Sequence, residues 1–163
     1  GRAAAALDGV VAFPEVPADP QAELLRWMMA QHVHVASRRA LVQQMMSDAL
    51  ERPDAASCAS QGPNSAAASL RDYVVKLRRH GLIAGPEQIS PTEVAAAVTM
   101  LMGALFSDAM HRELMPEMFS QTVDDSLRAY VRIFLRGLGA LPASPAPGSD
   151  ASMRLFTTSA VSE

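Results

Sequence analysis

One stretch of this 163-residue chain restricts its fold more than any other, because no charged residue lies between Glu93 and Asp108. The stretch follows the sequence Ser-Pro-Thr-Glu at residues 90–93, which offers a capping serine, a proline at the first helical position and the glutamate of a capping box. A helix with so little charge must be covered on nearly all sides. The uncharged run is shorter than the roughly 20 residues that span a bilayer. We therefore expect a helix buried in protein and no membrane association.

The remaining segments also have helical periodicity, and none has a convincing two-residue alternation of the kind that strands show. The sequence therefore predicts an all-α fold, with residues 1–139 as one domain and the Pro-, Ala- and Ser-rich residues 140–163 as a tail. The expected helices cover residues 2–13, Pro20 to a bend near Ser37, the bend to about Glu51, Asn64 or Ser65 to Gly81, Pro91 to about His111, and Thr122 to Leu138. Ser37 could cap the helix that follows the bend. A loop of small residues is expected over 53–63.

The last expected helix carries a wide apolar surface. Arg128, Arg132 and Arg136 form a polar stripe that spans only about 80° of its circumference, and apolar residues cover roughly 200°. One apolar neighbour would need about half of that width. The excess predicts two apolar neighbours, one within the chain and one outside it.

Composition and motifs exclude several classes of function. A net charge of −3 and a pI near 5.8 disfavour a chain that binds nucleic acid by itself. The single cysteine, Cys58, rules out an internal disulfide and fits the reducing cytoplasm. His32 and His34 face different ways on a helix, so they cannot share a metal. No phosphate-binding loop, His-Glu-x-x-His or Gly-x-Ser-x-Gly motif is present. We expect no enzyme activity, no cofactor and no metal.

Four patterns, taken in order, resemble a known family. They are Leu77-Arg78-Arg79-His80-Gly81-Leu82-Ile83, the capped start at 90–93, the Ala/Val/Met/Leu helix with Gly103, and Val131-Arg132-Ile133-Phe134-Leu135-Arg136-Gly137-Leu138. Over about residues 2–139 the chain resembles the C-terminal ligand-binding and dimerisation domain of TetR/AcrR-family transcriptional regulators. The resemblance implies that the last two long helices pair with their mates in a four-helix homodimer interface. It also implies an apolar pocket for a small lipophilic effector. DNA would be bound only through a helix-turn-helix domain that is missing from this chain.

The resemblance and the apolar helix faces together suggest two sets of residues. The candidate ligand-binding residues are Trp27, His32, Met45, Met46, Tyr73, Met100 and Phe106. The candidates for the dimer interface, or for the core just behind it, are Leu101, Leu105, Leu127, Tyr130, Val131, Phe134 and Leu138. Apolar residues at helical spacing are most often ordinary core. A free-standing helical dimerisation module without a ligand is therefore the main alternative, and a closed, fully packed interior would favour it. An enzyme built on a helical bundle is a weaker one.

Overall fold

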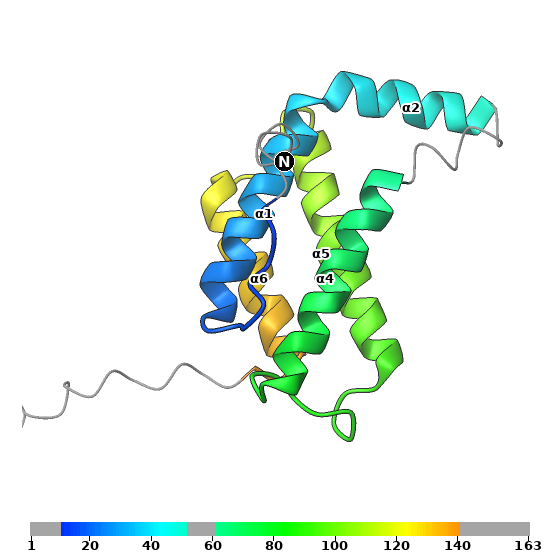
Figure 1. Cartoon of the computed structure of the whole chain (residues 1–163). Helices are drawn as coiled ribbons and strands as arrows, with labels where there is room; N and C mark the ends of the chain where they lie inside the picture. Colours follow the sequence, from blue (N-terminus) through cyan, green and yellow to red (C-terminus); the bar gives the residue numbers. More distant parts are fainter. Residues whose placement is uncertain (1–10, 52–60, 141–163) are drawn as a thin grey trace, which may run out of the picture.

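The computed structural model describes residues 11–51 and 61–140, and over these residues the chain is helical and has no strand. The helices are α1 (Pro20–Ser37), α2 (Arg39–Glu51), α4 (Gln61–Arg79), α5 (Pro91–His111) and α6 (Val123–Gly137) (Figure 1). The predicted all-α class is confirmed. Cys58, the tail and most of the first expected helix lie outside the described residues.

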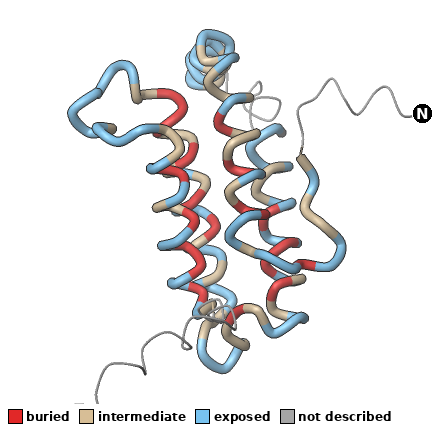
Figure 2. Tube along the Cα trace, turned by 90° about the vertical axis from the view of Figure 1, so that its left-hand side faces the viewer, coloured by how far each residue is buried: buried red, intermediate tan, exposed pale blue. Residues whose placement is uncertain are grey.

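Four of the helices form a bundle, and α2 projects from its top (Figure 1). The central helix is α5, which packs against α1, α4 and α6, while α1 also packs against α6. Buried residues line the inward sides of these helices (Figure 2). The largest fully buried side chains are Trp27, Tyr73, Leu24, Met28, Leu70, Leu77, Met110, Leu127, Leu138, Val74, Val98 and Val131. The core therefore draws on all four helices.

Most helix ends lie where the local sequence predicts them. Asp19, Ser90 and Thr122 cap α1, α5 and α6, and each side chain accepts a backbone N–H from the first turn. The capping box between Ser90 and Glu93 is complete. After α4, Gly81 has a φ of +67°, and the N–H of Leu82 donates to the carbonyl of Leu77 at 3.0 Å. These starts and stops depend on neighbours in sequence, which is why the sequence predicts them.

Three boundaries differ from expectation. Residues 11–13 were expected to be helical but are not. They belong to an irregular segment from Val11 to Asp19 that leads into α1. Helix α4 begins at Gln61 rather than at Asn64 or Ser65, so Pro63 lies in its first turn. A proline is tolerated there because the first N–H groups of a helix have no helical partner. The bend near Ser37 is confirmed, but Ser37 ends α1 and does not cap α2.

The central helix is less covered than predicted. Ala96, Thr99, Met100 and Gly103 lie on an exposed side of α5, and Met100 is 72% exposed. The expectation that this helix is covered on nearly all sides is wrong for the single chain, because α1, α4 and α6 reach only part of its circumference. By length and composition alone, α5 is also long and apolar enough to cross a membrane, a test that core helices of globular proteins pass as well.

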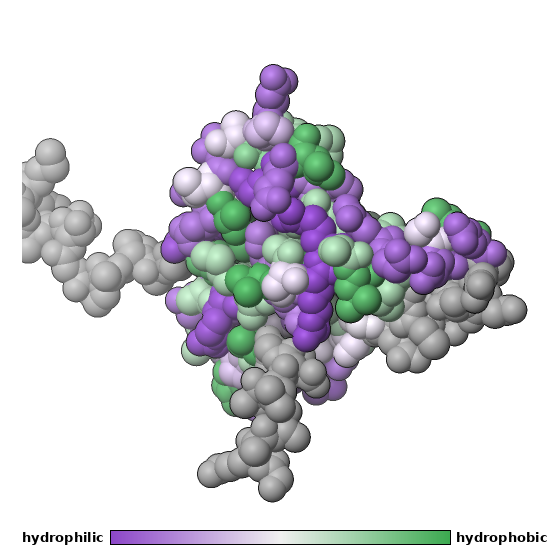
Figure 3. Space-filling model, turned by 90° about the horizontal axis from the view of Figure 1, so that it is seen from above, coloured by the Kyte–Doolittle hydropathy of each residue, from purple (hydrophilic) through white to green (hydrophobic). Residues whose placement is uncertain are grey.

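The projecting helix α2 has no buried residue. Its first residue, Arg39, donates hydrogen bonds to the carbonyl of Ala109 on α5. Its large apolar side chains Leu41, Met46 and Leu50 are all exposed. Seen nearly end-on at the top of Figure 2, α2 is exposed or half-buried along its length. Viewed from above, the surface mixes hydrophilic and hydrophobic side chains and has no single apolar face (Figure 3).

Candidate functional site

The most connected polar group inside the bundle is the carboxylate of Asp108, near the end of α5, which is completely buried. His32 Nε2 on α1 lies 2.9 Å from Asp108 Oδ1. Arg112 donates from Nε and Nη2 at 2.8 and 2.6 Å, and the hydroxyl of Tyr130 on α6 donates at 3.1 Å. One carboxylate thus joins α1, α5 and α6. A buried charge is tolerated only with such a full set of partners.

The guanidinium of Arg112 extends this network to the surface. Its Nη1 donates to the carbonyls of Phe119 and Gln121, its Nη2 donates to Ser126 Oγ at 3.0 Å, and it stacks over the Phe119 ring at 5.6 Å. Arg112 therefore fixes the connection between α5 and α6 against the start of α6. The geometry is that of a structural clamp, because one guanidinium holds the Asp108 carboxylate, two backbone carbonyls and the Ser126 hydroxyl at once.

The charges of the network support one another. Burial by itself raises the pKa of Asp108, but hydrogen bonds from Arg112, His32 and Tyr130 outweigh it and hold that pKa below 3.8. The hydrogen bond to Asp108 raises the pKa of Arg112. Burial and the adjacent carboxylate of Asp108 raise the pKa of Tyr130. Asp108 is therefore ionised at neutral pH and has no proton to give, which argues against a role in acid catalysis.

A second arrangement joins α1 to α4 through three aromatic rings. Phe13 stacks on Tyr73 of α4 with ring centroids 4.0 Å apart, and on Trp27 of α1 with centroids 5.2 Å apart. The planes differ by only 11° and 24° respectively. Trp27 and Tyr73 are each 1% exposed, whereas Phe13 is half-buried. We call these three residues the aromatic stack. It fills the space between two helices whose main contacts are with other helices.

A buried carboxylate borders the aromatic stack. Glu23, one turn before Trp27, accepts a hydrogen bond from the Tyr73 hydroxyl and from the backbone N–H groups of Ala18 and Asp19 at 2.9 and 3.0 Å. Burial raises the pKa of Glu23, but these hydrogen bonds outweigh it and the net shift is downward. Burial and the hydrogen bond to Glu23 raise the pKa of Tyr73. The phenol thus stays protonated and orients the carboxylate.

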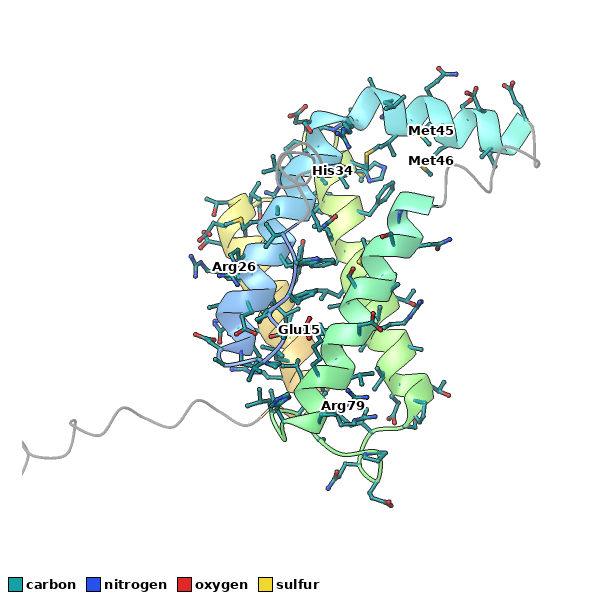
Figure 4. The ribbon with its side chains drawn as sticks, in the orientation of Figure 1. Glu15, Arg26, His34, Met45, Met46 and Arg79 are labelled. Atoms are coloured by element: carbon teal, nitrogen blue, oxygen red, sulfur yellow. The ribbon has the colours of Figure 1, made fainter. Side chains whose placement is uncertain are left out.

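The structure does not bring the seven candidate ligand-binding residues into one pocket. Trp27 and Tyr73 lie in the aromatic stack, and His32 contacts Asp108. Met45 and Met46 lie on α2, away from the body of the bundle (Figure 4). Met100 is on the surface of α5, and Phe106 is half-buried on the same helix. These residues were chosen because each lies on the apolar face of its helix. The apolar residues of α2 lie outside the core, and Met100 of α5 lies on the surface, so the chosen residues do not meet.

The seven candidates for the dimer interface mostly belong to the core of the single chain. Leu101, Leu105, Leu127, Val131, Phe134 and Leu138 are all buried without a partner subunit, and Tyr130 is half-buried. These residues were expected either in the dimer interface or in the core just behind it, and the structure places most of them in the core. A charge at Phe134 would disrupt folding and would not test dimerisation. The exposed large apolar residue of α6 is Ile133, which is 65% exposed.

A shallow hollow of about 680 Å³ lies on the surface near the start of α6. It is lined by Met118, Phe119, Ser120, Gln121, Asp125, Ser126, Arg128, Ala129, Tyr130 and Arg132. None of the candidate ligand-binding residues lines it. Sequence reasoning missed both this hollow and the Asp108 network, because both depend on contacts between α5, α6 and the connection that joins them. The i, i+4 spacing of Asp108 and Arg112 is the one signal that could have indicated the network.

No protein-family model matches this chain, and no curated protein or solved structure matches it either.

Proposed function

We propose that this chain is the homodimerisation and effector-binding domain of a TetR-like transcriptional regulator of the cytoplasm. The order of its helices, with a capped and almost uncharged α5 followed by an arginine-striped α6, supports this proposal. DNA would be bound by a helix-turn-helix domain outside this sequence. The observation that carries the proposal is that α5 and α6 each leave a large apolar side chain exposed, Met100 on α5 and Ile133 on α6.

The hydrogen bond from Tyr130 to Asp108 identifies which sides of α5 and α6 border each other. Ile133 and Gly137 are three and seven residues after Tyr130, so they share its side of α6. On α5, Met100 precedes Asp108 by eight residues, which places it about 80° around the helix from Asp108 and on the exposed side of α5. Met100 is 72% exposed and Ile133 is 65% exposed. Each of the two helices therefore leaves one large apolar side chain exposed, and we call the surface of Met100 and Ile133 the α5–α6 edge.

Small residues make this edge accessible to another backbone. A Cβ added at Gly103 or Gly137 would meet nothing within 4 Å. Between Glu93 and Asp108, α5 presents no charge that a partner would have to desolvate. A second copy that presents the same two helices would cover Met100 and Ile133 in a two-fold, self-complementary contact. The dimer interface would then contain four helices, two from each subunit.

Introducing a charge at this edge tests the proposal. Ile133→Glu and Met100→Glu should each weaken dimerisation by about 2 kcal/mol, or roughly 30-fold, because two carboxylates would be buried near the two-fold axis. Sedimentation equilibrium would measure the dissociation constant. Val33→Glu is a matched control, because Val33 on α1 is 66% exposed and lies outside the edge. A monomeric wild type, or variants that dimerise as the control does, would refute the proposal.

A free-standing dimerisation module without a small-molecule ligand is the second candidate. The observation that favours it is the filled interior, since Trp27 and Tyr73 are 1% exposed with the ring of Phe13 between them. Both candidates share the α5–α6 interface, so the sedimentation experiment does not separate them. They differ in whether an apolar ligand raises the melting temperature by binding the folded state.

A further inference from the structure

The aromatic stack combines two well-supported rings with one that is weakly held. Trp27 and Tyr73 belong to long helices and are buried. Phe13, the middle ring, belongs to the irregular segment 11–19, which we call the strap. The strap runs beside α1 toward the start of that helix (Figure 1). The two outer rings thus form the walls of a slot, and the strap supplies what fills it.

Apart from the stacking of the Phe13 ring, few contacts hold residues 11–16 of the strap. Its residues 11–18 take part in no backbone–backbone hydrogen bond within the described residues. Lys76 of α4 reaches the carbonyl of Pro14 at 3.4 Å and the carboxylate of Glu15 at 3.2 Å, and Glu15 is almost fully exposed. Glu15 lies between α1 and α4 in Figure 4.

The end of the strap next to α1 is anchored, because Pro17 is buried and Glu23 accepts the backbone N–H groups of Ala18 and Asp19. Residues 11–16 have few buried contacts and no backbone–backbone hydrogen bond, so this part of the strap opens at low cost.

We propose that the slot between Trp27 and Tyr73 is a binding site for a flat aromatic molecule of one or two fused rings, which replaces Phe13 and releases the strap. This inference rests on the effector-binding part of the proposed function. It replaces the expected pocket of seven residues with a narrower site whose two walls are Trp27 and Tyr73.

The ligand class follows from the shape of the space that Phe13 occupies. Its ring lies 4.0 and 5.2 Å from the two walls and nearly parallel to both. Aromatic rings prefer such stacked arrangements, and they gain more there than their buried area alone provides. A saturated ring of similar size is too thick for the space and lacks a π face. The slot therefore selects flat molecules over merely apolar ones.

Release of the strap would transmit ligand binding to the part of the chain that precedes residue 11. The strap joins α1 to everything that precedes it in the chain, and it contacts α4 through Lys76. A ligand that takes the place of Phe13 favours the state in which the strap is free, because it binds only that state. Any domain joined to residue 11 would then lose its fixed attachment to the bundle.

Binding of 2-naphthol to the intact chain is the test, and its saturated analogue decahydro-2-naphthol is the matched probe. Calorimetry should show that the wild type binds 2-naphthol and that the saturated analogue binds at least about tenfold more weakly. Phe13→Ala should bind 2-naphthol about tenfold more tightly, because no ring has to leave the slot first. Equal affinity for the two probes would overturn the proposal, and so would a wild type that binds neither.

Limited proteolysis locates the change. A glutamate-specific protease should cleave after Glu15 about fivefold faster when 2-naphthol is bound, because cleavage requires a detached strap. The cleavage site is identified by mass spectrometry. Unchanged or slower cleavage at Glu15 would overturn the proposal, even if the probe binds.

Phe119→Ala is the control for the hollow beside α6, which also contains an aromatic ring. This variant should bind 2-naphthol as the wild type does, and loss of binding would assign the ligand to the hollow and overturn the proposal. Sedimentation of the same preparations separates this inference from the proposed dimer. A wild type that dimerises but does not bind the probe contradicts only the slot.

Discussion

Two aspartate–arginine pairs in this chain have the same i, i+4 spacing but opposite surroundings. Asp108 and Arg112 meet inside the bundle, where the aspartate is completely buried. Asp124 and Arg128 meet on the surface of α6, where both side chains are about half exposed. Water and salt screen an exposed pair, so it adds little to stability, whereas a buried charge that loses its partner is strongly destabilising. The two pairs therefore provide an internal comparison.

Asp108→Asn should lower the free energy of unfolding by about 3 kcal/mol at pH 7, because Arg112 is left without its buried counter-charge. Asp124→Asn should change it little. Since folding lowers the pKa of Asp108, the stability that its ionisation contributes is present above the ordinary value of 3.8 and is lost as the pH falls through the lower folded value. The difference between wild type and Asp108→Asn should shrink below about pH 4. Chemical denaturation across this pH range measures both effects, and an equal cost for the two variants would contradict the assignment.

The two aspartates also show why the sequence alone predicts so little at this scale. The i, i+4 spacing is visible for both pairs, and it suggests the same weak surface contact for each. Only the packing of α1 and α6 around the end of α5 distinguishes them, since His32 and Tyr130 come from distant parts of the chain. Individual apolar residues were also predicted to be functional where they are core. Side-chain type and helical period do not distinguish these two roles.

At the scale of the helices, the positions of the helix ends were the feature that the sequence predicted best. Their signals lie within four residues, as in the capping box at Ser90 and the glycine stop at Gly81. The irregular conformation of residues 11–13 was not predicted, because the alanine-rich sequence before them favours a helix and nothing local indicates that Phe13 will stack on Trp27 and Tyr73. The uncovered side of α5 was not predicted either, because a lack of charge specifies that a face is apolar and not what covers it.

Two glycines that end helices in the same way make a second comparison. Gly81 and Gly139 have φ values of +67° and +65°, but a Cβ at Gly81 meets nothing within 4 Å, and one at Gly139 lies 2.8 Å from the Cβ of Ala84. Gly81→Ala should cost about 1 kcal/mol for the left-handed backbone alone. Gly139→Ala should cost at least about 2 kcal/mol, because Ala84 is held in place by the hydrogen bond from its N–H to the carbonyl of Leu138. Thermal denaturation measures both variants. Equal losses would mean that the contact with Ala84 relaxes freely.

At the scale of the whole molecule, a single chain buries a complete core and still leaves an apolar edge along α5 and α6. The wide apolar surface of α6 predicts two apolar neighbours, one within the chain and one outside it. The buried residues of α6 pack against the neighbour within the chain. Ile133 and Met100 remain for the other. The predicted excess of apolar surface is thus present, but it is smaller than the sequence suggests, because Leu127, Phe134 and Leu138 face inward. A dimer built on this edge adds stability to a protomer that already has its own core.

Such a dimer links stability to protein concentration. Because the folded dimer dissociates into two unfolded chains, each tenfold rise in concentration stabilises it by about 1.4 kcal/mol per dimer. For two chains of this length, that corresponds to a rise in melting temperature of about 2 °C. Calorimetric scans of the wild type over a hundredfold range of concentration should therefore differ by about 4 °C. Ile133→Glu should melt at a lower temperature than the wild type at each concentration at which the wild type is dimeric, because its dimer is weaker, and Val33→Glu should follow the wild type. A wild-type melting temperature that does not change with concentration would mean that the α5–α6 edge has no partner in solution.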